Sequence, residues 1–195
     1  MRFSCGCHCL AFAALLVPAS GAAAQALRPL TPEGEFFFLA YGVNDTVAAD
    51  QGFGSRGWGG GLGGGALLFE VLSAKLSVDL GLHSDKAEFE QSTTGGQRKS
   101  SVGFALATAS IGLRTPKLPR RGVGVSAGVN LGHGWIKGSR DITNCINCRV
   151  DVLDVDGGSY LEGVFVVGPV GVAYRRYSNG DLRSALRIAF VARPK

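Results

Sequence analysis

The amino-acid sequence predicts an all-β chain: an eight-stranded, antiparallel, up-and-down transmembrane β-barrel preceded by a cleavable signal peptide. Three observations support this fold class. Apolar and polar residues alternate with a period of two through most of the chain, and the connections between these segments are long and short in turn. The tryptophans and tyrosines gather near one end of the segments. No window after the first 26 residues sustains an apolar stripe at helical spacing.

The first 26 residues have the features of a secretory signal peptide. Arg2 supplies a positive charge, residues 9–17 are apolar, and small residues follow Pro18. We expect cleavage after Ala26, with Ala24 as the alternative. The sequence therefore divides into a signal peptide (1–26), a short N-terminal segment (27–34) and the barrel (35–192).

The alternation is clearest at residues 75–83, where every second residue is a leucine or valine and the residues between them are polar or glycine. Successive side chains of a strand point to opposite faces, so such a segment has one apolar face. Similar segments give eight expected strands: 35–43, 57–71, 74–84, 99–114, 122–137, 158–168, 170–178 and 182–192.

The glycine-rich stretch 57–65 is predicted to belong to the second strand. Gly59, Gly61 and Gly64 fit the G-x-G-x-x-G spacing of a nucleotide-binding turn, but that turn needs a following helix, and here a strand pattern follows. As a strand, the stretch places Trp58 outward and four glycines inward, where they leave room for large side chains of other strands. The alternation slips near Leu67 and Leu68, which predicts a bulge.

Long and short connections fall on opposite ends of the expected meander, which is the pattern of outer-membrane barrels with long external loops. All tryptophans and tyrosines then lie near the long-loop end, and several phenylalanines lie near the other end. Rings of aromatic residues are typical of the two interfaces of a bilayer. The predicted aromatic belts include Tyr41, Trp58, Trp135, Tyr174 and Phe190.

In these features the chain resembles the small eight-stranded outer-membrane barrels of the OmpA/OmpX type. The last segment, with Leu186, Ile188 and Phe190 on alternate positions, is similar to the C-terminal assembly signal of that family, although further residues follow it here. The resemblance implies the outer membrane of a diderm bacterium, with membrane lipid and the barrel-assembly machinery as partners. It brings no catalytic motif and no cofactor.

Charged residues within the strands predict an ion-pair network inside the barrel. Lys75, Asp79, Glu162, Arg175 and Arg187 all have inward parity. Unpaired charges in a narrow interior are costly, so we expect these side chains to pair with one another. Such a network braces the strands or, alternatively, forms a gated polar path.

Two cysteines follow the signal peptide, Cys145 and Cys148, and both lie in the longest connection. Export places them in an oxidising compartment, which favours a disulfide between them. One alternative is a free or metal-binding pair of cysteines. Another is a redox motif, which is less favoured because the sequence has no βαβ pattern.

No catalytic set emerges from the sequence. His83, Ser84 and Asp85 are the residue types of a nucleophilic triad, but adjacent strand residues point to opposite faces and do not converge. The sequence thus predicts a non-enzymatic barrel with a side-chain-filled lumen and no metal, cofactor or nucleic-acid site, which is structural or binds an extracellular ligand through its loops. Three alternatives stay open: a narrow channel, a lipid-modifying enzyme and a soluble periplasmic barrel.

Overall fold

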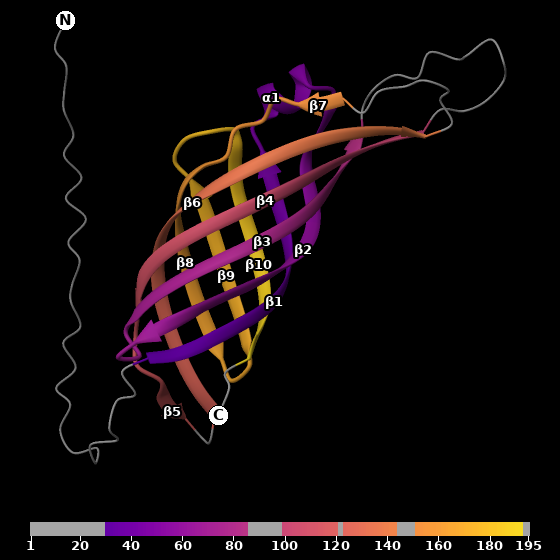
Figure 1. Cartoon of the computed structure of the whole chain (residues 1–195). Coiled ribbons are helices and arrows are strands. Elements are labelled where there is room, and N and C mark those ends of the chain that lie inside the picture. The colour runs from indigo at the N-terminus through magenta and orange to yellow at the C-terminus, as the bar shows by residue number, and fades with distance from the viewer. Residues whose placement is uncertain (1–29, 86–98, 121–122, 144–150, 193–195) are drawn as a thin grey trace, which may run out of the picture.

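A computed structural model describes residues 30–85, 99–120, 123–143 and 151–192, which form a closed antiparallel barrel (Figure 1). Consecutive wall strands pair with each other, and the barrel closes because the first wall strand also pairs with the last. The predicted all-β, eight-stranded antiparallel barrel is therefore confirmed. The eight wall strands are β1 (Leu30–Val43), β2 (Phe53–Leu68), β3 (Leu72–Asp85), β4 (Lys99–Arg114), β6 (Val123–Thr143), β8 (Gly158–Val167), β9 (Val170–Tyr177) and β10 (Leu182–Ala192).

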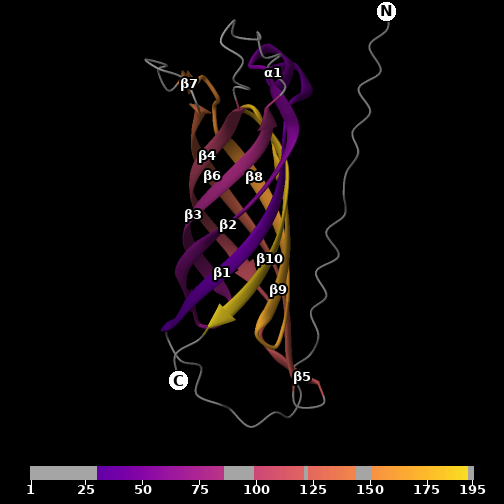
Figure 2. The same ribbon diagram turned by 90° about the vertical axis from the view of Figure 1, so that its right-hand side faces the viewer.

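Three short elements decorate the ends of the barrel. The helix α1 (Asp45–Asp50) and strand β7 (Asp151–Leu153) lie at one end, and strand β5 (Leu118–Arg120) lies at the other (Figures 1 and 2). The tight turns at residues 69–71 and 168–169 are at the β5 end. The long connections thus share the α1 end, as the alternation of connection lengths predicts. None of the three short elements was predicted, because three to six residues are too few to establish a period.

The strands are staggered around the wall. Following Cα partners once around the barrel from Lys137 of β6 leads back to β6 at Ala127, a stagger of ten residues. Closing a sheet requires such a stagger together with strand tilt, and eight strands enclose an interior that side chains can fill. The tilt is visible in both views.

The structure corrects three local expectations. Strand β1 begins at Leu30 rather than residue 35, and the carboxylate of Glu33 is buried in this added part of the strand. The expected bulge near residue 67 is wrong, because Leu67 points inward and Leu68 outward in unbroken register. The register of β2 shifts between Phe53 and Gly57 instead.

The turn between β2 and β3 is also three residues earlier than expected. Phe69 and Glu70 both have positive φ angles, 51° and 58°, which place them in the left-handed region. The turn therefore occupies residues 69–71, and Leu72 already pairs with Leu68.

The two faces of the wall differ in kind. The inner face holds most of the charged side chains of the described strands, and the outer face is apolar. Exposed outward residues include Phe36, Phe38, Leu62, Leu76, Val78, Leu80, Ile111, Leu131, Leu161, Phe165, Val172, Leu186 and Ile188. No α-helix in the described segments is long and apolar enough to cross a bilayer.

Candidate functional site

The middle of the lumen is occupied by a chain of six charged side chains whose signs alternate. It runs from Lys75 through Glu35, Arg187, Glu162 and Arg175 to Asp79, with successive N···O distances of 2.9, 2.7, 3.3, 2.5 and 3.5 Å. The structure thus brings together the five residues that sequence parity placed inside, and it adds Glu35. The chain links β1, β3, β8, β9 and β10, so it connects opposite sides of the wall.

Neutral polar groups complete the coordination of these charges. Asn130 donates to Glu162 at 2.9 Å and accepts from Ser73 at 2.9 Å. Ser77 donates to Asp79 at 3.0 Å. Buried charges are tolerated only when such bonds replace those lost with water.

Aromatic rings also cover the two arginines. The guanidinium of Arg187 lies 3.7 Å from the centroid of the Phe37 ring, and that of Arg175 lies 4.5 Å from the centroid of Tyr160. Cation–π contacts of this kind are favoured for Arg and strengthen where water is excluded.

A second ion pair lies nearer the β5 end, between Arg114 of β4 and Glu33 of β1. Arg114 Nη1 is 2.9 Å from one carboxylate oxygen and 3.1 Å from the other. Together the pair and the six-residue chain hold four carboxylates and four cations, so their charges balance. A lumen with equal numbers of positive and negative side chains is better suited to bracing the strands than to conducting ions of one sign.

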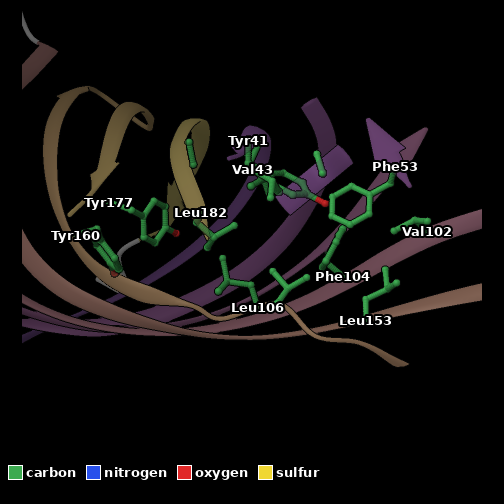
Figure 3. Close-up of a cluster of buried hydrophobic side chains, with 14 of the residues drawn as sticks. Tyr41, Val43, Phe53, Val102, Phe104, Leu106, Leu153, Tyr160, Tyr177 and Leu182 are labelled. Atoms are coloured by element: carbon green, nitrogen blue, oxygen red, sulfur yellow. The ribbon is translucent and has the colours of Figure 1, made fainter. Parts of the chain in front are cut away.

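The α1 end of the lumen is closed by an apolar cap (Figure 3). Phe53 and Phe104 pack edge to face with ring centroids 5.4 Å apart, and His83 lies 4.9 Å from Phe104. The ring nitrogen Nδ1 of His83 is hydrogen-bonded to the carbonyl oxygen of Gly54 at 2.6 Å. We call this set the apolar cap: Tyr41, Val43, Phe53, Val102, Phe104, Leu106, Leu153, Tyr160, Tyr177 and Leu182.

The connections at that end reinforce the cap. Ala48 of α1 is buried in the same cluster, and Val47 packs against it. Arg140 of β6 donates to the carbonyl oxygen of Gln51 at 2.5 Å, which fixes the end of α1 to the wall. The segment after β1 is therefore folded onto the mouth of the barrel.

Little space remains inside. One cavity of about 10 Å³ lies between the apolar cap and the charged chain, lined in part by Tyr41, Asp79 and Leu106. Another of about 10 Å³ lies near the β5 end beside Arg114 and Ser126. Each is large enough for about one water molecule. The two cavities are separate, one on the α1 side of the charged chain and one near the β5 end.

Four of the five residues assigned to the aromatic belts lie on the outer face, as predicted. Trp58, Trp135, Tyr174 and Phe190 are exposed on the outer face. Tyr41 is only 8% exposed and belongs to the apolar cap, so its assignment to the belt is wrong. The reason is parity: Tyr41 is in phase with Phe37, which points inward. Tyr160 and Tyr177, which were expected near the long-loop end, also lie inside.

One serine–histidine pair lies on the outer face. His133 of β6 and Ser159 of β8 are cross-strand partners, and His133 Nδ1 is 3.2 Å from Ser159 Oγ. His133 also packs against Trp135, with ring centroids 4.9 Å apart. His83, the other histidine after the expected signal peptide, is buried against Phe53 and Phe104 of the apolar cap and does not approach this pair.

Cys145, Cys148 and the expected signal peptide lie outside the described residues, so the disulfide and the cleavage site stay predictions. Within the described segments, no three His, Cys, Asp or Glu side chains are grouped to hold a metal ion.

Comparisons with known proteins add a likeness in fold. No family model matches the sequence, and no curated protein matches it. Among solved structures, the chain is similar to the crystal structure of Ail, the attachment invasion locus protein of Yersinia pestis. The TM-score is 0.43 and the identity 10%, over 84% of this chain and 96% of that chain.

Proposed function

We propose that this chain is an integral outer-membrane barrel with a closed, side-chain-filled lumen, which acts structurally or through its long connections and not as an enzyme. The observation that carries the proposal is the polarity of the two faces of the wall. Apolar side chains cover the outside of the wall, and ion pairs fill the inside. This arrangement suits a wall surrounded by lipid.

The proposal includes the position of the barrel in the membrane. Trp58, Trp135 and Tyr174 mark the interface toward the α1 end, and Phe69, exposed in a tight turn, lies at the opposite end. Outer-membrane barrels have short periplasmic turns, so the α1 end faces the outside of the cell. The partners are membrane lipid, the assembly machinery during insertion and an extracellular ligand at the long connections.

We expect the protein to stay with the membrane fraction after extraction with carbonate or urea. We also expect it to migrate differently on a gel before and after boiling, because a closed strand ladder resists detergent until it is heated. Release by carbonate or urea indicates a soluble barrel and contradicts the proposal. Steady conductance across a planar bilayer contradicts the closed lumen.

A second candidate function, hydrolysis of a lipid ester, is favoured by the His133–Ser159 pair. His133 also lines a groove of about 710 Å³ on the outer face, together with small residues such as Ala105 and Ala107. Nucleophilic serine catalysis needs a base within hydrogen-bond reach and a third group that orients the base. In the described part of the chain, no carboxylate is hydrogen-bonded to His133, and we therefore rank this function second.

The serine tests the second candidate. If Ser159 is a nucleophile, the purified protein releases fatty acid from phospholipid vesicles, and Ser159→Ala abolishes the release. The matched control is Ser178→Ala, whose hydroxyl donates to the carbonyl oxygen of Ser159 at 3.1 Å without contacting the imidazole. No release by the natural sequence, or equal release by Ser159→Ala, eliminates this candidate.

A further inference from the structure

Arginines gather on the outer face near the α1 end. One row of Cα partners crosses four neighbouring strands and has an arginine at each end. It contains Arg56 of β2, Gly42 of β1, Ser184 of β10 and Arg176 of β9. Arg183 lies next to Ser184 in β10. We call Arg56, Arg176 and Arg183 the rim arginines.

The rim arginines differ from the lumen arginines in their partners. Arg175 and Arg187 each contact carboxylates inside the barrel. Arg56 and Arg176 are exposed and have no ion pair within the described residues. Arg183 is 3.3 Å from Asp45, but both side chains are largely exposed, at 65% and 71%. Such an exposed pair contributes little and is readily exchanged for another anion.

The rows beneath the rim arginines are amphipathic and then wholly apolar. Two residues further from the rim, the corresponding Cα partners are Trp58, Ala40, Leu186 and Tyr174. The next row contains Gly60, Phe38, Ile188 and Val172. Trp and Tyr take positions at the headgroup level of a bilayer, with apolar side chains at the level of the acyl chains.

A hollow separates the two sides of this patch. It has a volume of about 510 Å³, and the small residues Ala40, Gly42 and Ser184 line it between Arg56 and Arg176. Three strand spacings of about 4.8 Å place those arginines about 14 Å apart at the backbone. This width suits a lipid headgroup more than a single small ion.

We propose that the rim arginines bind the phosphate of a phosphorylated lipid in the outer leaflet, whose acyl chains descend over Leu186 and Ile188. This inference rests on the proposed membrane function. The guanidinium group forms bidentate hydrogen bonds with phosphate, and its charge is attracted to an anionic membrane surface. The small residues of β1 and β10 leave the headgroup its space, and Trp58 and Tyr174 flank it.

The two tryptophans of the sequence permit a direct test. Trp58 lies at the proposed site, and Trp135 lies on β6, outside the patch. Trp135→Phe leaves Trp58 as the reporter, and Trp58→Phe leaves Trp135. Each protein is placed in phosphatidylcholine bilayers that contain either brominated phosphatidic acid or brominated phosphatidylcholine, whose bromine atoms quench nearby tryptophan fluorescence.

We expect brominated phosphatidic acid to quench Trp58 more strongly than brominated phosphatidylcholine does, and to show no such preference at Trp135. Arg56→Ser and Arg176→Ser should each lower the relative binding constant at Trp58 about fivefold. The matched control Lys137→Ser removes an exposed cation from β6 and should leave the binding constant at Trp58 unchanged. Asp45→Asn should raise this binding constant, because Arg183 loses its competing carboxylate.

Each contrary result has a distinct meaning. Equal quenching of Trp58 by the two lipids overturns the lipid site but leaves the membrane barrel intact. If Lys137→Ser lowers the binding constant at Trp58 as much as the rim arginine variants do, the attraction is a general effect of charge, and the site is also overturned. Displacement of phosphatidic acid by inorganic phosphate at similar concentration shows that a free ion is the ligand. Absence of quenching by either lipid at both tryptophans contradicts the membrane function itself.

Discussion

Arg175→Leu is expected to destabilise the barrel by about 3–5 kcal/mol, the usual cost of removing one partner of a buried ion pair. Arg175 contacts Glu162 at 2.5 Å and Asp79 at 3.5 Å, and all three side chains are almost completely buried. Without the guanidinium, Asp79 loses its cation, and Glu162 keeps only Arg187 and Asn130. Urea unfolding in detergent micelles, followed by tryptophan fluorescence and by gel mobility without boiling, measures the loss.

The neighbouring residue supplies the control. Arg176→Leu makes the same chemical change one position along β9, on the exposed outer face, and should change the free energy of unfolding by less than about 1 kcal/mol. The double variant Arg175→Leu/Glu162→Leu should recover part of the loss, because Arg187 keeps Glu35 at 2.7 Å. Equal stability of Arg175→Leu and Arg176→Leu means that the charged chain does not brace the wall.

The strands of the wall were predictable because the alternation of apolar and polar residues is repeated in each of them. Period-two alternation assigns each strand residue to a face, and register errors are costly when one face is buried. The parity of Lys75, Asp79, Glu162, Arg175 and Arg187 therefore placed them inside. Parity does not predict which of these side chains pair with each other. Arg187 bridges Glu162 and Glu35 because the stagger of the closed barrel brings these residues together.

Parity alone indicates an inward position for two further residues of β1. Tyr41 was assigned by its height along the strand and its residue type, although parity with Phe37 pointed it inward. Glu35 shares that parity, and it lies inside as the partner of Lys75 and Arg187. In a filled barrel, inward positions are occupied by charged partners as well as by apolar side chains.

The features near the α1 end had no sequence signal of comparable strength. Helix α1 has six residues, and its burial depends on Ala48 and Val47 meeting the apolar cap, which several strands assemble. The row that joins Arg56 to Arg176 crosses four strands and becomes visible only when their register is known. Both features are consequences of closure rather than of any local pattern.

Gly61→Ala is expected to destabilise the barrel by about 3 kcal/mol or more, at the upper end of the cost of overpacking a core. A Cβ atom on Gly61 would lie 2.7 Å from Cζ of Phe37 and against the carbonyl oxygen of Val78. Phe37 is completely buried, and its ring covers the guanidinium of Arg187. The inward glycines of β2 therefore make room for the ring that shields the charged chain.

The same substitution three residues further along β2 provides the comparison. On Gly64 the nearest atom to a new Cβ is the carbonyl oxygen of Glu33, at an ordinary distance of 3.8 Å. Gly64→Ala should be neutral or slightly stabilising, because alanine restricts the unfolded chain more than glycine does. Adding Phe37→Leu to Gly61→Ala should recover the part of the loss that comes from the ring, and the remainder measures the contact with the Val78 carbonyl. Equal unfolding midpoints for Gly61→Ala and Gly64→Ala would show that the glycine face is not needed for packing.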